Sequence, residues 1–353
     1  MVNLDDPKLF KQYDREGMLE HLHQMPQLCQ EAWQMAMKFK LPQDYGEVNK
    51  VVISGMGGSA IGGLLAKSLI LSEARLPIFI HSDYGLPAFV DDKTLLIASS
   101  YSGMTEETLS SFEKALTTGS KKLAITTGGT LESMAEERNI PVFSFDYKAP
   151  PRTALPFNFL PILGFLGRLG FIGDKSKDVA EMVQILEEMS QEINETQVSK
   201  ENPAKKLAQE FHGKLVVVYG ASILSEVAHR WKTQLNENAK AWAFHEVFPE
   251  LNHNAVVGYQ FPPELAGKIA VVLLRSNLFP ERIKLRYKVT SELLEQAKVS
   301  YHFVDGRGRS PLSQLMSLVL FGDYLSYYLA ILYQIDPTPV KAIDYLKEQL
   351  GKG

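Results

Sequence analysis

The sequence predicts an α/β protein made of two similar domains, each with a parallel sheet flanked by helices. The chain has 353 residues, a length that fits two domains better than one. Short apolar runs alternate with helical patterns, and this alternation is typical of parallel sheets. The same succession then starts again in the second half of the chain. With 45% hydrophobic and 22% charged residues, the composition is that of an ordinary globular protein.

The first half opens with a helical pattern over residues 13–39, which a segment containing proline and glycine ends. Five strands are then expected at VVIS (51–54), PIFIH (77–81), TLLIAS (94–99), KKLAITT (121–127) and IPVFSF (140–145). Helices are expected between them at 58–70, 104–119 and 131–138. The first, third and fourth strands each lead into a helix, so the strands are predicted to run parallel.

The second half repeats this order. Strands are expected at KLVVVYG (214–220), KIAVVLLRS (268–276) and SYHFVDG (300–306), and helices at 223–238 and 281–298. VVISGMGGSAIGGLLAK and LVVVYGASILSEVAHRWK share the pattern of apolar strand, glycine, small residues and helix, about 164 positions apart, a spacing far longer than a solenoid repeat. We therefore predict a duplicated domain, with an N-terminal domain at 1–200 and a C-terminal domain at 201–353.

Charge and cysteine content narrow the possible partners and location. The net charge of −4 gives no basic surface for nucleic acid or anionic lipid. Cys29 is the single cysteine and cannot form an internal disulfide, and the charged N-terminus does not resemble a signal peptide, so a cytoplasmic location is expected. Residues 315–335 are almost long enough to span a membrane, but Asp323 interrupts them, and we interpret the segment as a buried core helix.

The glycine-rich segment GMGGSAIGG (55–63) lies between an expected strand and an expected helix, which is a common position for phosphate binding. One interpretation is a dinucleotide site, because Gly55, Gly57 and Ala60 match GxGxxA and Asp83 follows the next strand. The other is the phosphate of a small sugar. The glycine segment alone leaves both interpretations open.

A second polar turn favours the sugar phosphate. Ser100, Ser102 and Thr105 follow an expected strand directly and precede an expected helix. Hydroxyl groups and free N–H groups at a helix start suit a phosphate monoester. The alternative is an ordinary helix cap, but capping requires only one such residue.

Six short motifs resemble, in order, those of the bifunctional phosphoglucose/phosphomannose isomerases, whose chains carry paired sugar isomerase (SIS) domains. The motifs are SGMGGSA (54–60), SSYSGMTEET (99–108), PPRTALP (150–156), NENAK (236–240), ELNHN (250–254) and LK (346–347). The resemblance implies two tandem flavodoxin-like SIS domains. It also implies conversion of glucose 6-phosphate and mannose 6-phosphate to fructose 6-phosphate through a cis-enediolate, without a cofactor. The expected phosphate contacts are Gly57, Gly58, Ser59, Ser100, Ser102 and Thr105.

The chemistry requires a base for the carbon proton, an acid or base for ring opening, and a cation near the enediolate oxygens. The resemblance implies that Glu237 is the base, that Arg152 steadies the enediolate, and that His253 opens the ring from the neighbouring subunit of a homodimer. Lys347 is implied to assist ring opening, with Lys341 as an alternative. Without the resemblance, Glu237 and the lysines would be interpreted as solvated residues and Arg152 equally well as a loop-bracing ion pair.

Further residues bear on substrate specificity, metal binding and the alternative function. Thr338 is a small residue at a place where the resemblance puts glutamine in strict phosphoglucose isomerases, and a small side chain leaves room for both C2 epimers. HEVFPELNH does not have the HExxH spacing, so no metal is expected. A non-catalytic sugar-phosphate regulator is the alternative function, although the first fifty residues contain no basic DNA-recognition helix.

Overall fold

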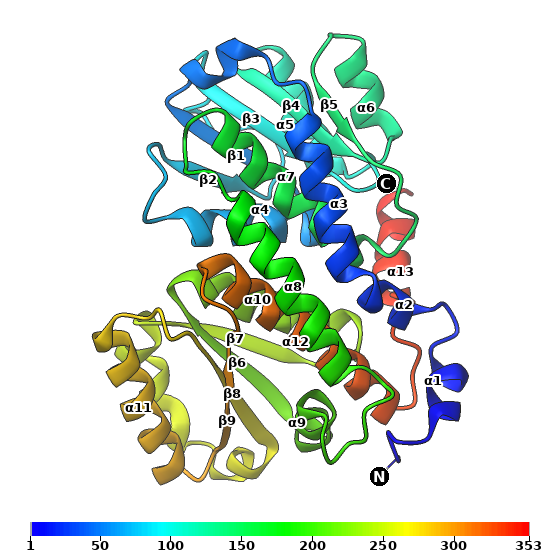
Figure 1. Ribbon diagram of the computed structural model, residues 1–353, viewed down its shortest axis with the longest axis vertical. Coiled ribbons are helices and arrows are strands. Elements are labelled where there is room, and N and C mark those ends of the chain that lie inside the picture. The colour runs from blue at the N-terminus through cyan, green and yellow to red at the C-terminus, as the bar shows by residue number, and fades with distance from the viewer. Residues whose placement is uncertain (1, 353) are drawn as a thin grey trace.

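The structure is a computed structural model that describes residues 2–352. It contains two parallel sheets, one in each half of the chain (Figure 1). The first sheet consists of β1 (Lys50–Ser54), β2 (Ile78–His81), β3 (Thr94–Ser99), β4 (Lys121–Thr126) and β5 (Val142–Ser144). The second consists of β6 (Leu215–Ala221), β7 (Ala243–Phe248), β8 (Ile269–Arg275) and β9 (Ser300–Asp305).

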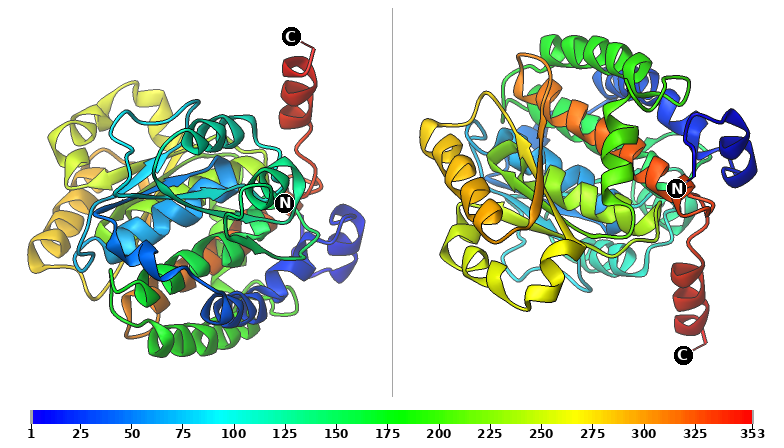
Figure 2. Two further views of the ribbon diagram at one scale, coloured as in Figure 1. Left: turned by 90° about the horizontal axis from the view of Figure 1, so that it is seen from above. Right: turned by 90° about the horizontal axis from the view of Figure 1, so that it is seen from below.

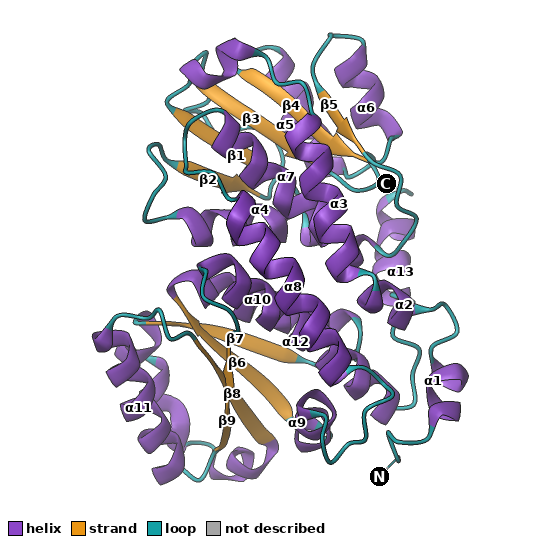
Figure 3. Ribbon diagram, viewed as in Figure 1, coloured by secondary structure: helices purple, strands orange, loops and turns teal. Residues whose placement is uncertain are grey.

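Helices flank both sheets, as the purple ribbons of Figure 3 show. In the first half they are α1 (Pro7–Tyr13), α2 (Met18–His23), α3 (Met25–Lys38), α4 (Gly57–Ile70), α5 (Glu106–Leu116), α6 (Gly129–Glu136), α7 (Leu155–Arg168) and α8 (Ser176–Ile193). In the second half they are α9 (Pro203–Phe211), α10 (Ser225–Glu237), α11 (Glu281–Gln296), α12 (Pro311–Leu332) and α13 (Lys341–Leu350). Short 3-10 helices are η1 (Gln43–Glu47), η2 (Pro151–Thr153), η3 (Ser222–Leu224), η4 (Glu250–His253), η5 (Ala255–Gln260) and η6 (Pro263–Lys268).

The strand order confirms the predicted fold class. The first sheet has the order β2-β1-β3-β4-β5, which is the flavodoxin-like order. The second has the order β7-β6-β8-β9, the same arrangement with one strand fewer, and every pair in both sheets is parallel. In such sheets the strand order reverses between the first and third strands, and ligands bind at the carboxyl ends of those two strands. In the first sheet this place lies after β1 and β3.

The middle of the molecule is a layer of helices between the two sheets, in which α4, α8, α10 and α12 lie (Figure 1). The helix α12 is long and apolar enough to cross a membrane, but it is completely buried inside the protein, which confirms the prediction of a core helix. Trp231 of α10 stacks on Phe321 of α12 with ring centroids 5.8 Å apart. This packing fixes α10, whose last residue is Glu237, relative to both sheets.

Some elements differ from the sequence-based expectation. The single leading helix over residues 13–39 is wrong, because α2 and α3 occupy this range and α1 precedes them. Gly17, with a left-handed backbone (φ 75°), and the Asp14 carboxylate, which accepts from the N–H groups of Met18 and Leu19 at 2.7 and 2.9 Å, separate α1 from α2. The strand β7 and the helix α7 were not expected. The domain boundary near residue 200 remains a prediction, and α8, which precedes it, packs on both α3 and α12.

Candidate active site

The glycine turn after β1 packs against two other loops. A Cβ atom added at Gly55 would lie 2.8 Å from the Ser99 carbonyl oxygen, and one added at Gly58 would lie 3.1 Å from the Pro151 oxygen and 3.3 Å from the Arg152 Cα. At contacts this close, a side chain could be added only if the neighbouring backbone moved. The glycines therefore bring the start of α4 against the hydroxyl-rich turn and the loop that carries Arg152.

The hydroxyl-rich turn after β3 is joined to the glycine turn. The Tyr101 N–H donates to the Ser59 hydroxyl at 3.1 Å, and the hydroxyls of Ser100 and Thr105 are hydrogen-bonded at 2.8 Å. The Ser102 hydroxyl accepts from the Met104 N–H at 3.2 Å. Thr105 is the N-cap of α5, but its hydroxyl makes no hydrogen bond to the first amides of the helix. Side-chain capping is thus not the role of Thr105 in this structure, and these amides stay available to an anion.

Arg152 lies in η2 and is 2% exposed. Its Nε donates to the Asn238 Oδ1 at 2.6 Å, and its Nη2 donates to the carbonyl oxygens of Pro337 and Thr338, each at 2.8 Å. Within residues 2–352, Nη1 makes no hydrogen bond and lies 3.6 Å from the Glu237 Oε2. Burial lowers the pKa of Arg152, and the neighbouring Glu237 opposes that shift. The guanidinium is therefore fixed on two nitrogens and presents the third to Glu237.

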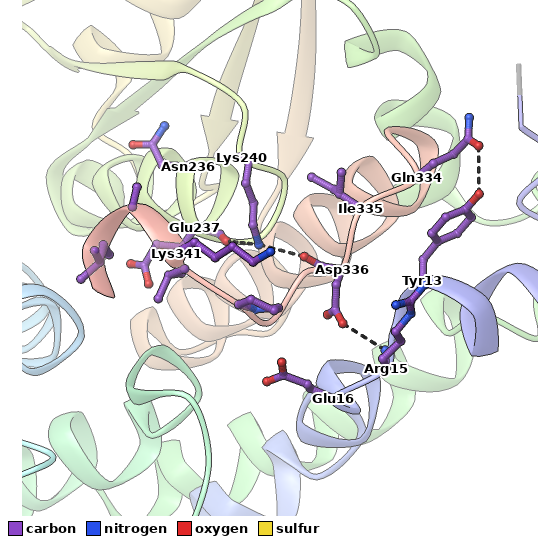
Figure 4. A pocket seen from close by; sticks show the side chains of 14 residues that line it. Tyr13, Arg15, Glu16, Asn236, Glu237, Lys240, Gln334, Ile335, Asp336 and Lys341 are labelled. Atoms are coloured by element: carbon purple, nitrogen blue, oxygen red, sulfur yellow. Dashed lines mark hydrogen bonds between the residues drawn. The ribbon is translucent and has the colours of Figure 1, made fainter. Parts of the chain in front are cut away.

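Glu237 ends α10 and its side chain is 27% exposed. It borders a cavity of about 820 Å³, shown in Figure 4 with the side chains that line it. The N-terminal segment contributes Tyr13, Arg15 and Glu16 to the wall, and the C-terminal segment contributes residues 334–336 and 339–343. The glycine turn and the hydroxyl-rich turn are not part of this wall; the glycine turn packs against the backbone of Arg152 at Gly58.

Sequence reasoning missed Lys240 and Asn238 as site residues, although both belong to NENAK. The Lys240 ammonium donates to the carbonyl oxygens of Glu237, Asp336 and Pro337 at 2.9, 2.9 and 2.8 Å. It thereby ties the turn after Glu237 to the segment that contains Thr338 (Figure 4). Burial of the ammonium and the nearby Arg152 charge lower its pKa to about 8. The signal in the sequence was its position in NENAK, three residues after Glu237; the structure adds that Lys240 has a left-handed backbone (φ 51°), which is uncommon for a residue other than glycine.

Thr338 is buried, and its hydroxyl has no hydrogen-bond partner in the described part of the chain. Its carbonyl oxygen accepts a hydrogen bond from the Arg152 Nη2. Arg152, Glu237 and Thr338, which are far apart in the sequence, thus come together in one place.

Two of the expected catalytic residues lie elsewhere in the single chain. His253 is exposed at the end of η4, and among the described residues no hydrogen bond or ion pair joins it to Glu237 or Arg152. Lys347 lies on α13, which has no buried residue and extends away from the body of the molecule (Figure 2). The alternative lysine, Lys341, lines the cavity. Residues 2–352 contain no group of three His, Cys, Asp or Glu side chains that could hold a metal ion.

Two parallel sheets flanked by helices, the first with a glycine turn after β1 and a hydroxyl-rich turn after β3, agree with a protein of tandem sugar isomerase domains. Residues 200–350 match the family of the bacterial phospho-glucose isomerase C-terminal SIS domain. The chain is 39% identical to the bifunctional phosphoglucose/phosphomannose isomerase of Caldicellulosiruptor bescii, over 95% of this chain and 99% of that protein. It is 36% identical to the enzyme of the same name from Aquifex aeolicus, over 88% of this chain and 93% of that protein.

A solved structure shares the fold. The hypothetical protein TT0462 from Thermus thermophilus superposes with a TM-score of 0.75, covering 98% of this chain and 92% of that chain at 17% sequence identity. The sequence relatives decide the family: this chain belongs to the bifunctional phosphoglucose/phosphomannose isomerases. Membership in an enzyme family does not favour the alternative of a non-catalytic regulator.

Proposed function

We propose that this protein interconverts glucose 6-phosphate and mannose 6-phosphate with fructose 6-phosphate through a cis-enediolate. The observation that carries the proposal is the pair formed by the Glu237 carboxylate and the Arg152 Nη1, 3.6 Å apart, beside a glycine turn suited to phosphate. The relatives whose names state this activity match 95% and 88% of the chain.

In the proposed mechanism, the phosphate binds at the two turns, held by the free N–H groups at the starts of α4 and α5 and by Ser59, Ser100, Ser102 and Thr105. Gly57 and Gly58 allow the ligand and the Arg152 loop to approach the backbone. Glu237 takes the proton from C2 of the open-chain aldose and returns it to C1 of the enediolate. The Arg152 Nη1 stabilises the enediolate oxygens while the negative charge is on them.

Thr338 supports acceptance of both sugars. Glucose 6-phosphate and mannose 6-phosphate differ only at C2, and Thr338 lies directly beside Arg152, where C2 is expected to bind. A short side chain there leaves space for either C2 configuration. Comparing the turnover of both aldose phosphates tests this, and a strong preference for one sugar would contradict it.

The homodimer and the catalytic role of His253 belong to the same proposal. His253 ends η4, which packs on β7 and η5, and η5 packs on η6. In and beside β7, η5 and η6 the chain exposes Trp242, Phe244, Val257, Phe261 and Leu265, with exposed fractions of 73, 42, 77, 79 and 43%. Exposed large apolar side chains gathered in this way are typical of a protein interface. In the dimer, His253 opens the ring of the substrate in the partner's active site. Lys347 reaches an active site only when α13 packs against that site.

We place the enzyme in the cytoplasm, in glycolysis and gluconeogenesis. The buried, unpaired Cys29 supports a reducing compartment.

The proposed function is tested by measuring fructose 6-phosphate formation from each aldose phosphate. Glu237→Gln is expected to lower kcat by about two to four powers of ten, because it removes the carbon base. Glu226→Gln is the matched control, since Glu226 lies on the same helix and its side chain is 26% exposed. A wild-type protein without turnover, or a Glu237→Gln variant with a normal rate, would reject the proposal.

A further inference from the structure

A row of buried polar side chains on α10 and at its C-terminal end contacts Arg152. Arg230, Gln234 and Asn238 follow one another at intervals of four residues and therefore share one face of the helix. This face meets α12 at Asp323 and Ser326. None of the six motifs contains Arg230, Gln234, Asp323 or Ser326, and the proposed mechanism assigns no role to these four residues or to Asn238.

Asp323 is the centre of this network. Arg230 Nη2 lies 3.3 Å from both carboxylate oxygens, and Gln234 Nε2 donates to the Asp323 Oδ1 at 2.7 Å. The same Arg230 Nη2 donates to the backbone carbonyl oxygen of Arg152 at 2.8 Å. One carboxylate thus orients the guanidinium that holds the Arg152 backbone.

The network also holds the Arg152 side chain. Asn238 accepts from the Arg152 Nε at 2.6 Å and donates from its Nδ2 to the Ser326 hydroxyl at 3.0 Å. The Ser326 hydroxyl donates to the carbonyl oxygen of Asp323 at 2.9 Å. The carbonyl group and the Nε of Arg152 are therefore both connected to the same turn of α12.

Stability alone is a poor explanation for this network. The side chains of Arg230 and Asp323 are each 2% exposed, and burying an ion pair costs desolvation that its attraction often fails to recover. In the described chain, Arg230 Nε and Gln234 Oε1 have no hydrogen-bond partner, which adds a further cost. Burial raises the pKa of the Asp323 carboxyl, and the Arg230 charge opposes that shift.

The charges around Arg152 indicate a role for this network. Arg152 and Arg230 bring two buried positive charges close together, and Asp323 is the buried carboxylate that compensates them. Glu237 is the other carboxylate beside Arg152, and as the carbon base it has to remain available to the substrate. With Asp323 in place, Glu237 is not needed to hold the two arginines.

We propose that Asp323 is a positioning residue for the isomerase reaction, which acts through Arg230, Gln234 and Asn238 to aim the free Nη1 of Arg152 at the enediolate. The inference rests on the proposed function. The phosphate turns follow β1 and β3 and take no part in the network. Loss of the Asp323 charge therefore affects turnover and leaves phosphate binding largely intact.

The test uses the full-length Asp323→Asn variant, which keeps the shape of the side chain and removes its charge. The kcat is expected to fall about 10- to 100-fold, the range that follows from misplacing a catalytic group by up to 1 Å. The KM is expected to stay within about threefold of the wild-type value, because phosphate binding supplies most of the substrate affinity. Tyr324→Phe is the control, since Tyr324 is also buried on α12 but bonds to Ser190 of α8, and its kcat is expected to remain normal.

A double-mutant cycle separates positioning from general damage. If Asp323 acts through Arg152, Asp323→Asn is expected to cost less than about twofold in kcat when introduced into Arg152→Lys. Fully multiplicative losses would overturn the inference, as would an unchanged kcat in the single variant or a rise in KM alone. Should Asp323→Asn fail to fold, Gln234→Met takes its place, with an expected kcat loss of at least about threefold at unchanged KM, and an unchanged kcat overturns the inference.

The wild-type protein distinguishes the two proposals. A wild type that does not isomerise either sugar phosphate rejects the proposed function and this inference with it. An active wild type with an unaffected Asp323→Asn variant rejects the role of Asp323 alone.

Discussion

A single methyl group at Gly58 tests whether the glycine turn and the Arg152 loop depend on each other. In Gly58→Ala, the new Cβ would lie 3.1 Å from the Pro151 oxygen and 3.3 Å from the Arg152 Cα. Both neighbours are backbone atoms and cannot rotate away, so the loop has to move by a few tenths of an ångström. The loop cannot move freely, because Asn238, Pro337 and Thr338 hold the Arg152 side chain from the other half of the chain.

The size of the effect follows from this displacement. Moving a catalytic group by about 1 Å costs about a hundredfold in rate, so a few tenths of an ångström is expected to lower kcat about 3- to 10-fold. Stability is expected to change little, because replacing glycine by alanine in a helix gains about 1 kcal/mol, which offsets much of the overpacking.

The assay is steady-state kinetics on both aldose phosphates, combined with urea unfolding. Gly164→Ala in α7 is the matched control, since its Cβ would lie equally close, at 3.1 Å, to the side chain of Ala36, away from Arg152. We expect a normal kcat for Gly164→Ala and a reduced kcat for Gly58→Ala. Equal kcat values for the two variants and the wild type would refute the coupling between the turn and the Arg152 loop.

Three further predictions concern pH, the dimer and the core. The pKa of Lys240 is about 8, so its ammonium loses its charge as the pH rises through 8, which weakens its bonds to the turn after Glu237. The kcat of the wild type is expected to decline in this range, whereas the kcat of Lys240→Arg is not, because arginine stays charged. A wild-type kcat that stays constant up to pH about 9.5 would contradict this. Mixing His253→Ala and Glu237→Gln subunits is expected to restore about a quarter of the wild-type activity. About half of randomly formed dimers contain one subunit of each variant, and each mixed dimer has one complete site out of two. No restoration after subunit exchange would argue against His253 acting across the interface. Gly322→Ala is expected to lower the free energy of unfolding, measured in urea, by about 1–3 kcal/mol, because the new Cβ would lie 2.4 Å from the Nε1 of the buried Trp231. An unchanged unfolding midpoint would show that α10 and α12 can move apart to accommodate the added methyl group.

Much of the fold could be predicted because the signal was local. The runs that became β1, β3, β4, β6 and β8 are apolar and short, lie between turn residues and are mostly buried, as the inner strands of parallel sheets are. The strand β7 was missed because it forms a sheet edge and carries the polar residues His245 and Glu246. The helix α7 was missed because it is buried on nearly every side, which removes the polar positions that reveal a helical period.

Local sequence patterns were enough to predict a repeated parallel α/β protein with a glycine turn and a hydroxyl-rich turn, because strand burial, helix starts and glycine turns are set by neighbouring residues. The sequence also indicated Arg152, Glu237 and Thr338 through their resemblance to a family. The three-dimensional arrangement was needed to find that these three residues meet, that Lys240 and Asn238 support them, and that His253 and Lys347 lie apart from them in one chain. The physical reason is that such contacts depend on how α10 and α12 pack between the two sheets, and this packing joins residues that are distant in the sequence.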